Sequence, residues 1–315
     1  MSRAVSKQKS YIQRTLINDL APFKATRDGS LEDSDFLKIT DYYAFGVPSI
    51  LGTAFATLRG TPVDENEQEM ITSLGALTGL FDDFFDKKSL SDAEIQELIN
   101  NPSRSKASTD SEKLFLHFYN KALAMVLDPE TLKKAFFAVY QAQVESKEQF
   151  NDLSREKLED ITLKKGGLSL LFYRYAMHNS LSEDEKKLLY ALGGLMQFGN
   201  DIFDVYKDTQ AGIRTLPNTA TSINQARTLF TSLLNEVYQL TQQTSFRKRD
   251  KNQFIRMISL GLSRCFVCLD QFERIERCSG GKFTPALYSR SDLICDMEKS
   301  SNLLRSLIYH IQYCK

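Results

Sequence analysis

The chain contains 315 residues, of which 42% are hydrophobic and 25% are charged, so it is long enough for one large or two modest domains. Forty basic side chains balance forty acidic ones, which excludes an overall electrostatic attraction to nucleic acid or to an anionic membrane. The N-terminal sequence MSRAVSKQKSYIQ lacks the apolar core of a signal peptide, and no run of about 18 apolar residues occurs. We therefore expect a cytoplasmic protein with no stable insertion into a membrane.

Apolar residues recur with a period close to 3.6 along nearly the whole chain, which predicts helices rather than strands. The breaks between these segments are rich in Gly, Pro, Ser or charge, and none is long enough to link two domains. We therefore expect an all-α helical bundle that forms a single domain over residues 1–315. The predicted helices, about a dozen, cover residues 8–19, 31–45, 48–59, 64–86, 91–99, 108–126, 129–149, 152–177, 183–209, 222–243, 249–277 and 291–313.

Two of these helices have recognisable starts. Thr109 or Ser111 precedes EKLFLHF, and Ser180 or Ser182 precedes EDEKK. A hydroxyl residue followed by acidic residues in the first turn is typical of a helix N-terminus, because it satisfies backbone N–H groups and complements the helix dipole.

Five cysteines lie in the last fifth of the chain, and an odd number does not suit a disulfide framework. Cys265 and Cys268 form a lone CxxC within the apolar run SLGLSRCFVCLDQF, and no second pair completes a zinc site. We therefore expect these two thiols to pack in the core.

The sequence FDDFFDKK at residues 81–88 closes the apolar and small-residue stretch ITSLGALTGL with a dense block of negative charge. Asp82 and Asp86 are four residues apart and project from the same face of a helix, whereas Asp83 is rotated by about 100°. Two carboxylates on one face repel each other unless a positive charge lies between them. The two lysines that follow could supply that charge at a solvated helix end, so this block alone leaves a surface alternative open.

A second acidic block, QFGNDIFDVYKD at residues 197–208, places Asn200, Asp204 and Asp208 at i, i+4 and i+8 on one helix face. Oxygen ligands at this spacing suit Mg²⁺, which is usually held by one or two carboxylates together with the phosphates of a substrate. If the two acidic stripes face each other across the bundle, they could hold a cluster of Mg²⁺ ions around a diphosphate.

Cationic side chains near the second block could bind the phosphate oxygens. Lys164 and Lys165 precede two glycines in LKKGGLS, and Lys207 lies within the second stripe beside Asp208. A pair of lysines at a helix surface is the alternative for Lys164 and Lys165.

The acidic blocks at residues 82–86 and 200–208 resemble the paired metal motifs of class I isoprenoid synthases, the terpene cyclases and trans-prenyltransferases. The second block is similar to the cyclase pattern N-D-x-x-S/T-x-x-K-E, with Asp204 where Ser or Thr is usual and Asp208 where Glu is usual. The resemblance implies three Mg²⁺ ions held by Asp82, Asp86, Asn200, Asp204 and Asp208.

Other branches of this superfamily share the second block. MQFGNDIFD resembles the F-Q-x-x-D-D-x-x-D of chain-elongating prenyltransferases, which implies that Gln197 contributes to substrate binding. KKGGL resembles their K-T-G-A-L, which implies that Lys164 binds diphosphate, with Lys165 beside it. NDIFDVYKDTQAGIRTLP resembles the N-x-x-x-D-x-x-x-D-x-x-x-G-R-x-x-x-P of squalene and phytoene synthases, which implies that Arg214 binds substrate.

The sequence also departs from these patterns. The R-R-G and G-G-K-R-x-R-P motifs with which elongating prenyltransferases bind isopentenyl diphosphate are missing, which argues against simple chain elongation. The Arg-Tyr dipeptide of many microbial cyclases is missing as well. Arg290 could stand in for it, and the diphosphate-sensing arginine would fall near Arg155, although a charged helix surface explains Arg155 equally well.

Small residues lie one and two turns before the predicted metal ligands, at Gly75, Gly79 and Gly193. They could leave depth for a long prenyl chain below the metal site, or they could allow close packing between helices. The sequence leaves both interpretations open.

The resemblance implies a Mg²⁺-dependent terpene synthase, a lyase that ionises a linear prenyl diphosphate, cyclises the carbocation and releases diphosphate. It also implies a homodimer, although the sequence locates no interface. One alternative is a squalene or phytoene synthase-like enzyme that condenses two prenyl diphosphates. A second is a non-catalytic helical protein that binds a lipid or a partner.

Overall fold

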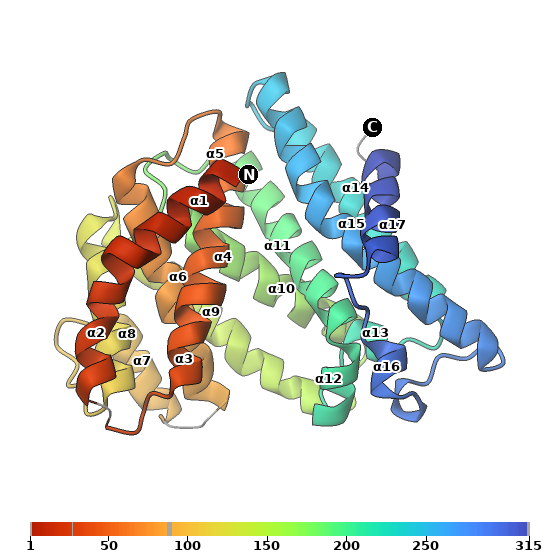
Figure 1. The fold of residues 1–315 in the computed structure, drawn as a ribbon, viewed down its shortest axis with the longest axis horizontal. Helices are drawn as coiled ribbons and strands as arrows, with labels where there is room; N and C mark the ends of the chain where they lie inside the picture. Colours follow the sequence, from red (N-terminus) through yellow and green to blue (C-terminus); the bar gives the residue numbers. More distant parts are fainter. Residues whose placement is uncertain (1, 27, 87–89, 314–315) are drawn as a thin grey trace. The chain divides into compact units, whose positions relative to one another are not determined.

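A computed structural model of the chain describes residues 2–26, 28–86 and 90–313, apart from the side chains of residues 2, 3 and 86. Throughout these residues the regular elements are helices, with no strand among them (Figure 1). The prediction of an all-α helical bundle is confirmed.

The chain divides into two compact units. The first comprises Met1–Phe137 and Phe172–Ser180, and the second comprises Ala138–Leu171 and Leu181–Lys315. The helices α9 (Pro129–Ser146) and α10 (Arg155–Arg174) each contribute residues to both units. The single domain expected over residues 1–315 stays a prediction.

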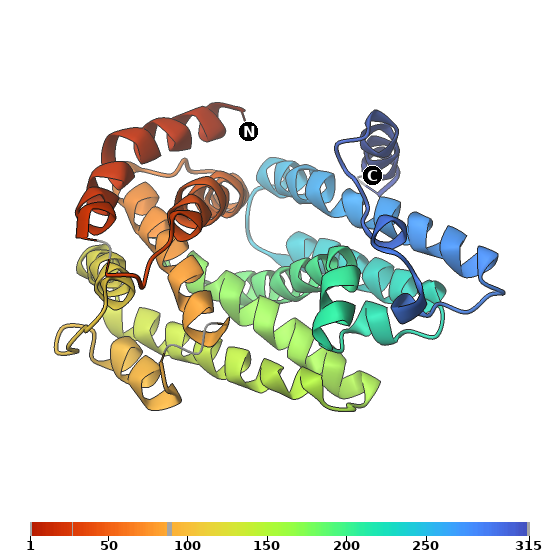
Figure 2. The same ribbon diagram turned by 60° about the horizontal axis from the view of Figure 1, so that its bottom comes forward.

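The first unit is organised around the long helix α6 (Glu65–Asp86), which packs against α8 and against the segment that runs from η2 to η3 (Figures 1 and 2). Leu74, Leu77, Phe81 and Phe84 of α6 are each at most 3% exposed, and their spacing of three or four residues defines the buried face. The other elements of this unit are α1 (Ser2–Tyr11), η1 (Ile12–Leu16), α2 (Ile17–Thr26), α3 (Asp33–Leu37), η2 (Lys38–Tyr43), α4 (Ala44–Gly46), η3 (Val47–Gly52), α5 (Thr53–Arg59), α7 (Asp92–Asn100) and α8 (Asp110–Met125).

The segments η2 and η3 are π-helical, so their backbone hydrogen bonds close over five residues instead of four. The sequence predicts ordinary helices over 31–45 and 48–59, and the wider turns are a finding of the structure. In a π-helix two residues that are five apart lie about one turn from each other. Lys38 and Tyr43, at the two ends of η2, therefore lie on the same side of this segment.

In the second unit, α11 (Glu183–Phe203) packs against α14 (Ile223–Gln243) and α15 (Lys248–Cys278), and α15 packs against α17 (Ser300–Tyr313). Figure 1 shows α14, α15 and α17 in the blue part of the chain. The predicted helix over 291–313 is divided into two pieces. The shorter elements of this unit are η4 (Lys147–Phe150), α12 (Val205–Ala211), α13 (Leu216–Thr219), η5 (Pro285–Leu287) and α16 (Arg290–Leu293).

The capping contacts show which of the candidate residues begins each of the two helices whose starts the sequence predicts. The Thr109 side chain accepts the backbone N–H of Glu112 at the start of α8, and the Ser182 side chain accepts that of Glu185 at the start of α11. Each hydroxyl satisfies one of the N–H groups that a helix terminus leaves without an internal partner.

Close helix packing explains the glycines that precede the acidic blocks. A Cβ on Gly193 of α11 would lie 2.2 Å from the carbonyl oxygen of Gly166 in α10, and a Cβ on Gly75 of α6 would lie 2.8 Å from that of Tyr43 in η2. At Gly79, the Cβ would lie 3.0 Å from a ring carbon of Tyr43. The structure therefore confirms the packing interpretation, and the expectation that these positions leave depth for a prenyl chain is wrong because neighbouring atoms fill that space.

The two cysteines of the CxxC sequence are buried, with exposed fractions of 4% for Cys265 and 0% for Cys268, and neither forms a disulfide. The prediction that they pack in the core is confirmed. Among the described residues, no helix combines the length and the apolar character that crossing a bilayer requires.

Candidate metal and diphosphate site

The first acidic block occupies the C-terminal end of α6. Asp82 and Asp83 lie in its last two turns, and the last turn contains no basic residue. The C-terminal end of a helix carries partial negative charge, so a carboxylate there is unfavourable unless a positive charge compensates it. The partners of these carboxylates therefore decide how well the end of α6 tolerates them.

Two side chains of η2 contact this block. The Tyr43 hydroxyl donates a hydrogen bond of 2.6 Å to Oδ2 of Asp82, and the Lys38 ammonium lies 2.5 Å from Oδ1 of Asp83. Burial and the negative charge of Asp82 raise the pKa of Tyr43 above its usual value, so this phenol stays protonated and remains a donor. The two neighbouring carboxylates thus have different partners, a neutral phenol and a cation. The predicted ligand Asp86 is the last residue of α6, and its side chain lies outside the described part.

The second acidic block spans a break between two helices. The helix α11 ends at Phe203, Asp204 adopts φ −92° and ψ 9°, and α12 begins at Val205. The sequence predicts one helix over residues 183–209, and this prediction is wrong because the helix breaks at Asp204. Backbone hydrogen bonds from Asp204 to Asn200 (2.9 Å) and from Asp208 to Asp204 (2.8 Å) nevertheless continue the four-residue ladder. The spacing of these three residues by single turns survives the break.

The stripe of Asn200, Asp204 and Asp208 passes from solvent to the interior. Asn200 is exposed, Asp204 is partly buried and Asp208 is only 9% exposed. The Asn200 amide donates to Oδ2 of Asp204 over 3.4 Å, which joins the two outer members. Burial, with the charges of Asp201 and Asp204, raises the pKa of Asp208 to about 7. The surroundings of Asp208, at the inner end of the stripe, therefore disfavour its ionised form.

Asp201 is a member of this cluster that the sequence analysis did not select. It is 5% exposed and accepts hydrogen bonds from the Gln197 amide (2.8 Å) and from the Thr162 hydroxyl (3.2 Å). Burial raises its pKa to about 6. The sequence could have indicated Asp201, because it follows Asn200 directly and lies four residues after Gln197. That spacing places the Gln197 amide on the same helix face as the Asp201 carboxylate.

The predicted phosphate-binding cations separate into two groups. Lys165 and Lys207 lie close enough to Asp208 for their charges to lower its pKa, which opposes the effect of burial. Lys164 instead lies 2.5 Å from Oε2 of Glu145, and this ion pair raises the pKa of Lys164. The guanidinium of Arg214 lies 2.6 Å from Asp152.

The structure therefore brings Lys165 and Lys207 near Asp208 and joins Gln197 to Asp201. It directs Lys164 and Arg214 to other carboxylates. Binding of substrate by any of these five residues stays a prediction.

The donor set of the second block fits a hard cation. Its groups are carboxylate and amide oxygens, and burial, followed by the charges of Asp201 and Asp204, raises the pKa of Asp208. Among the described side chains, no three of His, Cys, Asp or Glu converge to hold a metal ion by themselves. One or two carboxylates per ion, completed by waters and phosphate oxygens, is the arrangement that Mg²⁺ usually adopts in phosphate sites.

The two acidic blocks belong to different units. Asp82 and Asp86 lie in the first, and Asn200, Asp204 and Asp208 lie in the second. Each block is described within its own unit, so their participation in one metal cluster stays a prediction.

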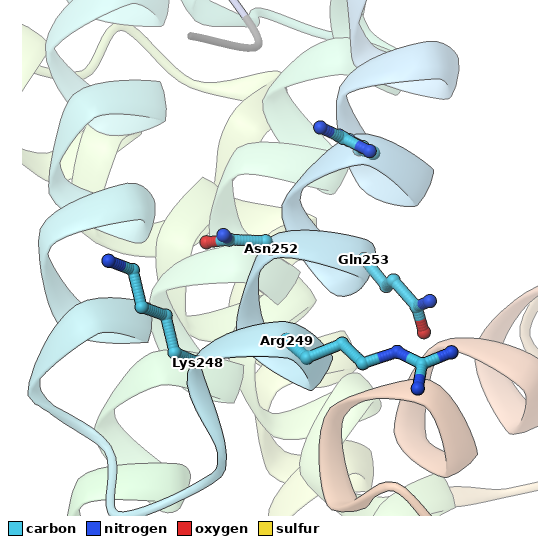
Figure 3. Close-up of a pocket in the computed structure, with 5 residues that line it drawn as sticks. Lys248, Arg249, Asn252 and Gln253 are labelled. Carbon is cyan, nitrogen blue, oxygen red and sulfur yellow. The ribbon is translucent and has the colours of Figure 1, made fainter.

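Two pockets in the second unit lie apart from the acidic stripe. An open pocket of about 500 Å³ is lined by Lys248, Arg249, Asn252, Gln253 and Arg256, all from the first turns of α15 (Figure 3). Its lining contains no carboxylate. A smaller pocket of about 60 Å³ includes Arg155 and Phe198 but none of the predicted metal ligands.

Comparisons with known protein families, with curated proteins and with solved structures found no match to this chain.

Proposed function

We propose that the protein is a Mg²⁺-dependent terpene synthase of the class I isoprenoid synthase superfamily. It ionises a linear prenyl diphosphate, cyclises the resulting carbocation and releases diphosphate. The substrate is a lipid-like molecule with a compact, highly charged head, so the site needs oxygen ligands for metal ions and an apolar interior for the hydrocarbon.

The observation that carries this proposal is the stripe formed by Asn200, Asp204 and Asp208. It keeps single-turn spacing across a helix break, it leads from solvent to a buried carboxyl, and neighbouring carboxylates oppose the ionisation of that carboxyl. A stripe that served only solubility would remain exposed along its length. A divalent cation would offset the repulsion that the apo protein carries.

The residues have two roles in the proposed reaction, binding of metal ions and binding of the phosphate oxygens. Mg²⁺ ions, when bound, would neutralise the negative charge that develops on the leaving diphosphate. Asn200, Asp204 and Asp208 would hold ions in the second unit, and Asp82 with Asp86 in the first. Lys165 and Lys207 add positive charge next to Asp208 and are therefore suited to the phosphate oxygens.

The test is diphosphate release from the purified protein supplied with C10, C15, C20 or C25 prenyl diphosphates, singly and in pairs, with and without Mg²⁺. Extracted hydrocarbons are identified by mass spectrometry. Release from a single substrate that requires Mg²⁺ and yields a cyclic product supports the proposal. Products that form only from paired substrates would assign the protein to the squalene or phytoene synthase type, and no release under any condition would favour the non-catalytic binding protein.

Matched variants separate the site from the fold. Asp82→Asn and Asp204→Asn should each reduce Mg²⁺-dependent release by about 100-fold or more, because each removes a charged ligand. Asp184→Asn is the control, since Asp184 is an exposed carboxylate in the first turn of α11, the helix that carries Asn200. It should leave the rate within about twofold of the wild type.

A further inference from the structure

We propose that Tyr43 is a positioning residue that holds Asp82 in the orientation needed to bind a divalent cation. The inference rests on the metal site of the proposed function and deepens it. Its basis is the direct hydrogen bond of 2.6 Å from the Tyr43 hydroxyl to Oδ2 of Asp82.

The hydrogen bond gives Oδ2 of Asp82 a defined partner. A phenol that donates to Oδ2 restricts the rotation of the carboxylate and occupies one lone pair of that oxygen. Because this donor is neutral, the hydrogen bond itself does not cancel the negative charge of the carboxylate. At the neighbouring Asp83 the partner is the Lys38 ammonium, which compensates the charge. The tyrosine therefore orients a ligand, whereas the lysine neutralises an adjacent carboxylate.

The local structure is built to bring Tyr43 to this place. Tyr43 ends the π-helical segment η2, and its backbone lies against α6 at Gly75, where a Cβ would be 2.8 Å from the Tyr43 carbonyl oxygen. Its ring passes Gly79, where a Cβ would be 3.0 Å from Cδ2. Two residues without side chains, one and two turns before Asp82, thus clear a path along which the ring reaches the carboxylate. A π-helical turn is itself a feature that recurs at functional sites.

A second tyrosine in the same unit provides a matched control. The Tyr173 hydroxyl forms a hydrogen bond of 2.7 Å with the hydroxyl of Thr78, one turn before Asp82 on α6. Tyr173 is 8% exposed, so removal of its hydroxyl perturbs the packing of α6 at least as much as removal of the Tyr43 hydroxyl. Burial and the charge of Asp82 raise the pKa of Tyr173, but the hydrogen-bond partner of its hydroxyl is Thr78 and not that carboxylate.

The experiment measures binding of Mn²⁺ to the full chain by electron paramagnetic resonance, which needs no substrate. Tyr43→Phe should weaken the affinity for Mn²⁺ by about 10- to 100-fold, the usual effect of removing a group that orients a metal ligand. Tyr173→Phe should change it by less than about threefold. In an Asp82→Asn background, Tyr43→Phe should have no further effect, because the ligand that it orients is already lost.

Thermal unfolding of each variant separates misfolding from loss of the metal. If Tyr43→Phe binds Mn²⁺ as the wild type does, or if both tyrosine variants weaken binding equally, the inference is wrong. A wild-type protein that does not bind Mn²⁺ also overturns it. A wild type that binds Mn²⁺ in a Tyr43-dependent manner but never releases diphosphate overturns the proposed function and leaves the inference standing.

Discussion

The acidic end of α6 and the acidic stripe of α11 and α12 share one sequence signal, carboxylates one helical turn apart. They differ in the groups that surround these carboxylates. In the first unit, Tyr43 and Lys38 from a neighbouring segment each contact one carboxylate. In the second, the carboxylates of Asp201, Asp204 and Asp208 gather near one another, and the pKa of Asp208 rises to about 7.

This difference indicates which block depends more on a cation. The α6 block is held by partners from its own unit, so it should change little when metal binds. In the α11–α12 stripe, burial and neighbouring carboxylates oppose the ionised form of Asp208. Metal binding should therefore change both the protonation of this carboxyl and the stability of the unit.

The largest effect is expected at Asp208. Asp208→Asn should reduce Mg²⁺-dependent diphosphate release by about 100-fold or more, because a buried carboxylate of the proposed metal site is lost. The same change should stabilise the metal-free protein at pH 8 by about 1–3 kcal/mol, because it removes an unfavourable charge. Steady-state kinetics and urea denaturation measure the two effects. A variant that loses both activity and stability would show that Asp208 is a structural residue.

The crossing of α10 and α11 should be the most sensitive packing contact of the second unit. A Cβ on Gly166 would lie 2.1 Å from the carbonyl oxygen of Gly193, so Gly166→Ala should destabilise the protein by about 3 kcal/mol or more. Gly79→Ala in the first unit should cost less, because its close neighbour is a side-chain ring that can move. Gly261→Ala is the control, since no atom lies within 4 Å of its Cβ position within α15, and it should be neutral or stabilising. Equal losses at positions 166 and 261 would contradict the packing account.

The stability of the apo protein should depend on pH through Asp208. Its carboxyl has a pKa near 7 in the folded chain and a lower value in the unfolded chain, so the folded state binds more protons between these values. The free energy of unfolding contributed by this group is therefore highest below about pH 4 and falls as pH rises to about 7, by about 1–2 kcal/mol. Urea titrations from pH 4 to 8 should show this slope in the wild type and a smaller one in Asp208→Asn. An identical slope in both proteins would exclude Asp208 as the source.

The smallest effects are expected at the two adjacent lysines of α10. Lys165→Gln should raise the KM for a prenyl diphosphate by about fivefold to tenfold, since its charge acts on Asp201 and Asp208. Lys164→Gln should change KM by less than about twofold, because a partly exposed ion pair with Glu145 contributes little. A larger effect at Lys164 than at Lys165 would show that Lys164 leaves Glu145 when substrate binds, as the resemblance to K-T-G-A-L implies.

Much of the fold could be predicted from the sequence. The 3.6-residue period located most helices to within a few residues, from α6 to α15, and acidic residues after Thr109 and Ser182 marked two helix starts. Local signals of this kind depend on residues that are close in sequence. They fail where a helix changes its hydrogen-bonding pattern, as at η2, or breaks without Gly or Pro, as at Asp204.

The candidate site could be predicted only in part. The spacing of Asn200, Asp204 and Asp208 predicted one face, and the backbone ladder retains it. The contacts of Tyr43 with Asp82 and of Lys164 with Glu145 join residues 39 and 19 positions apart, and no periodicity encodes such partners. The glycines were ambiguous for the same reason, because only the neighbouring helix decides whether a missing side chain leaves space or permits contact.

A crystal structure of the protein grown with Mg²⁺ and inorganic diphosphate would test the proposed metal and diphosphate site. We expect Mg²⁺ ions bound by Asp82 and by Asn200, Asp204 and Asp208, with diphosphate oxygens completing their coordination and Lys165 and Lys207 directed toward those oxygens. Diphosphate bound elsewhere, with no Mg²⁺ on either block, would contradict the account.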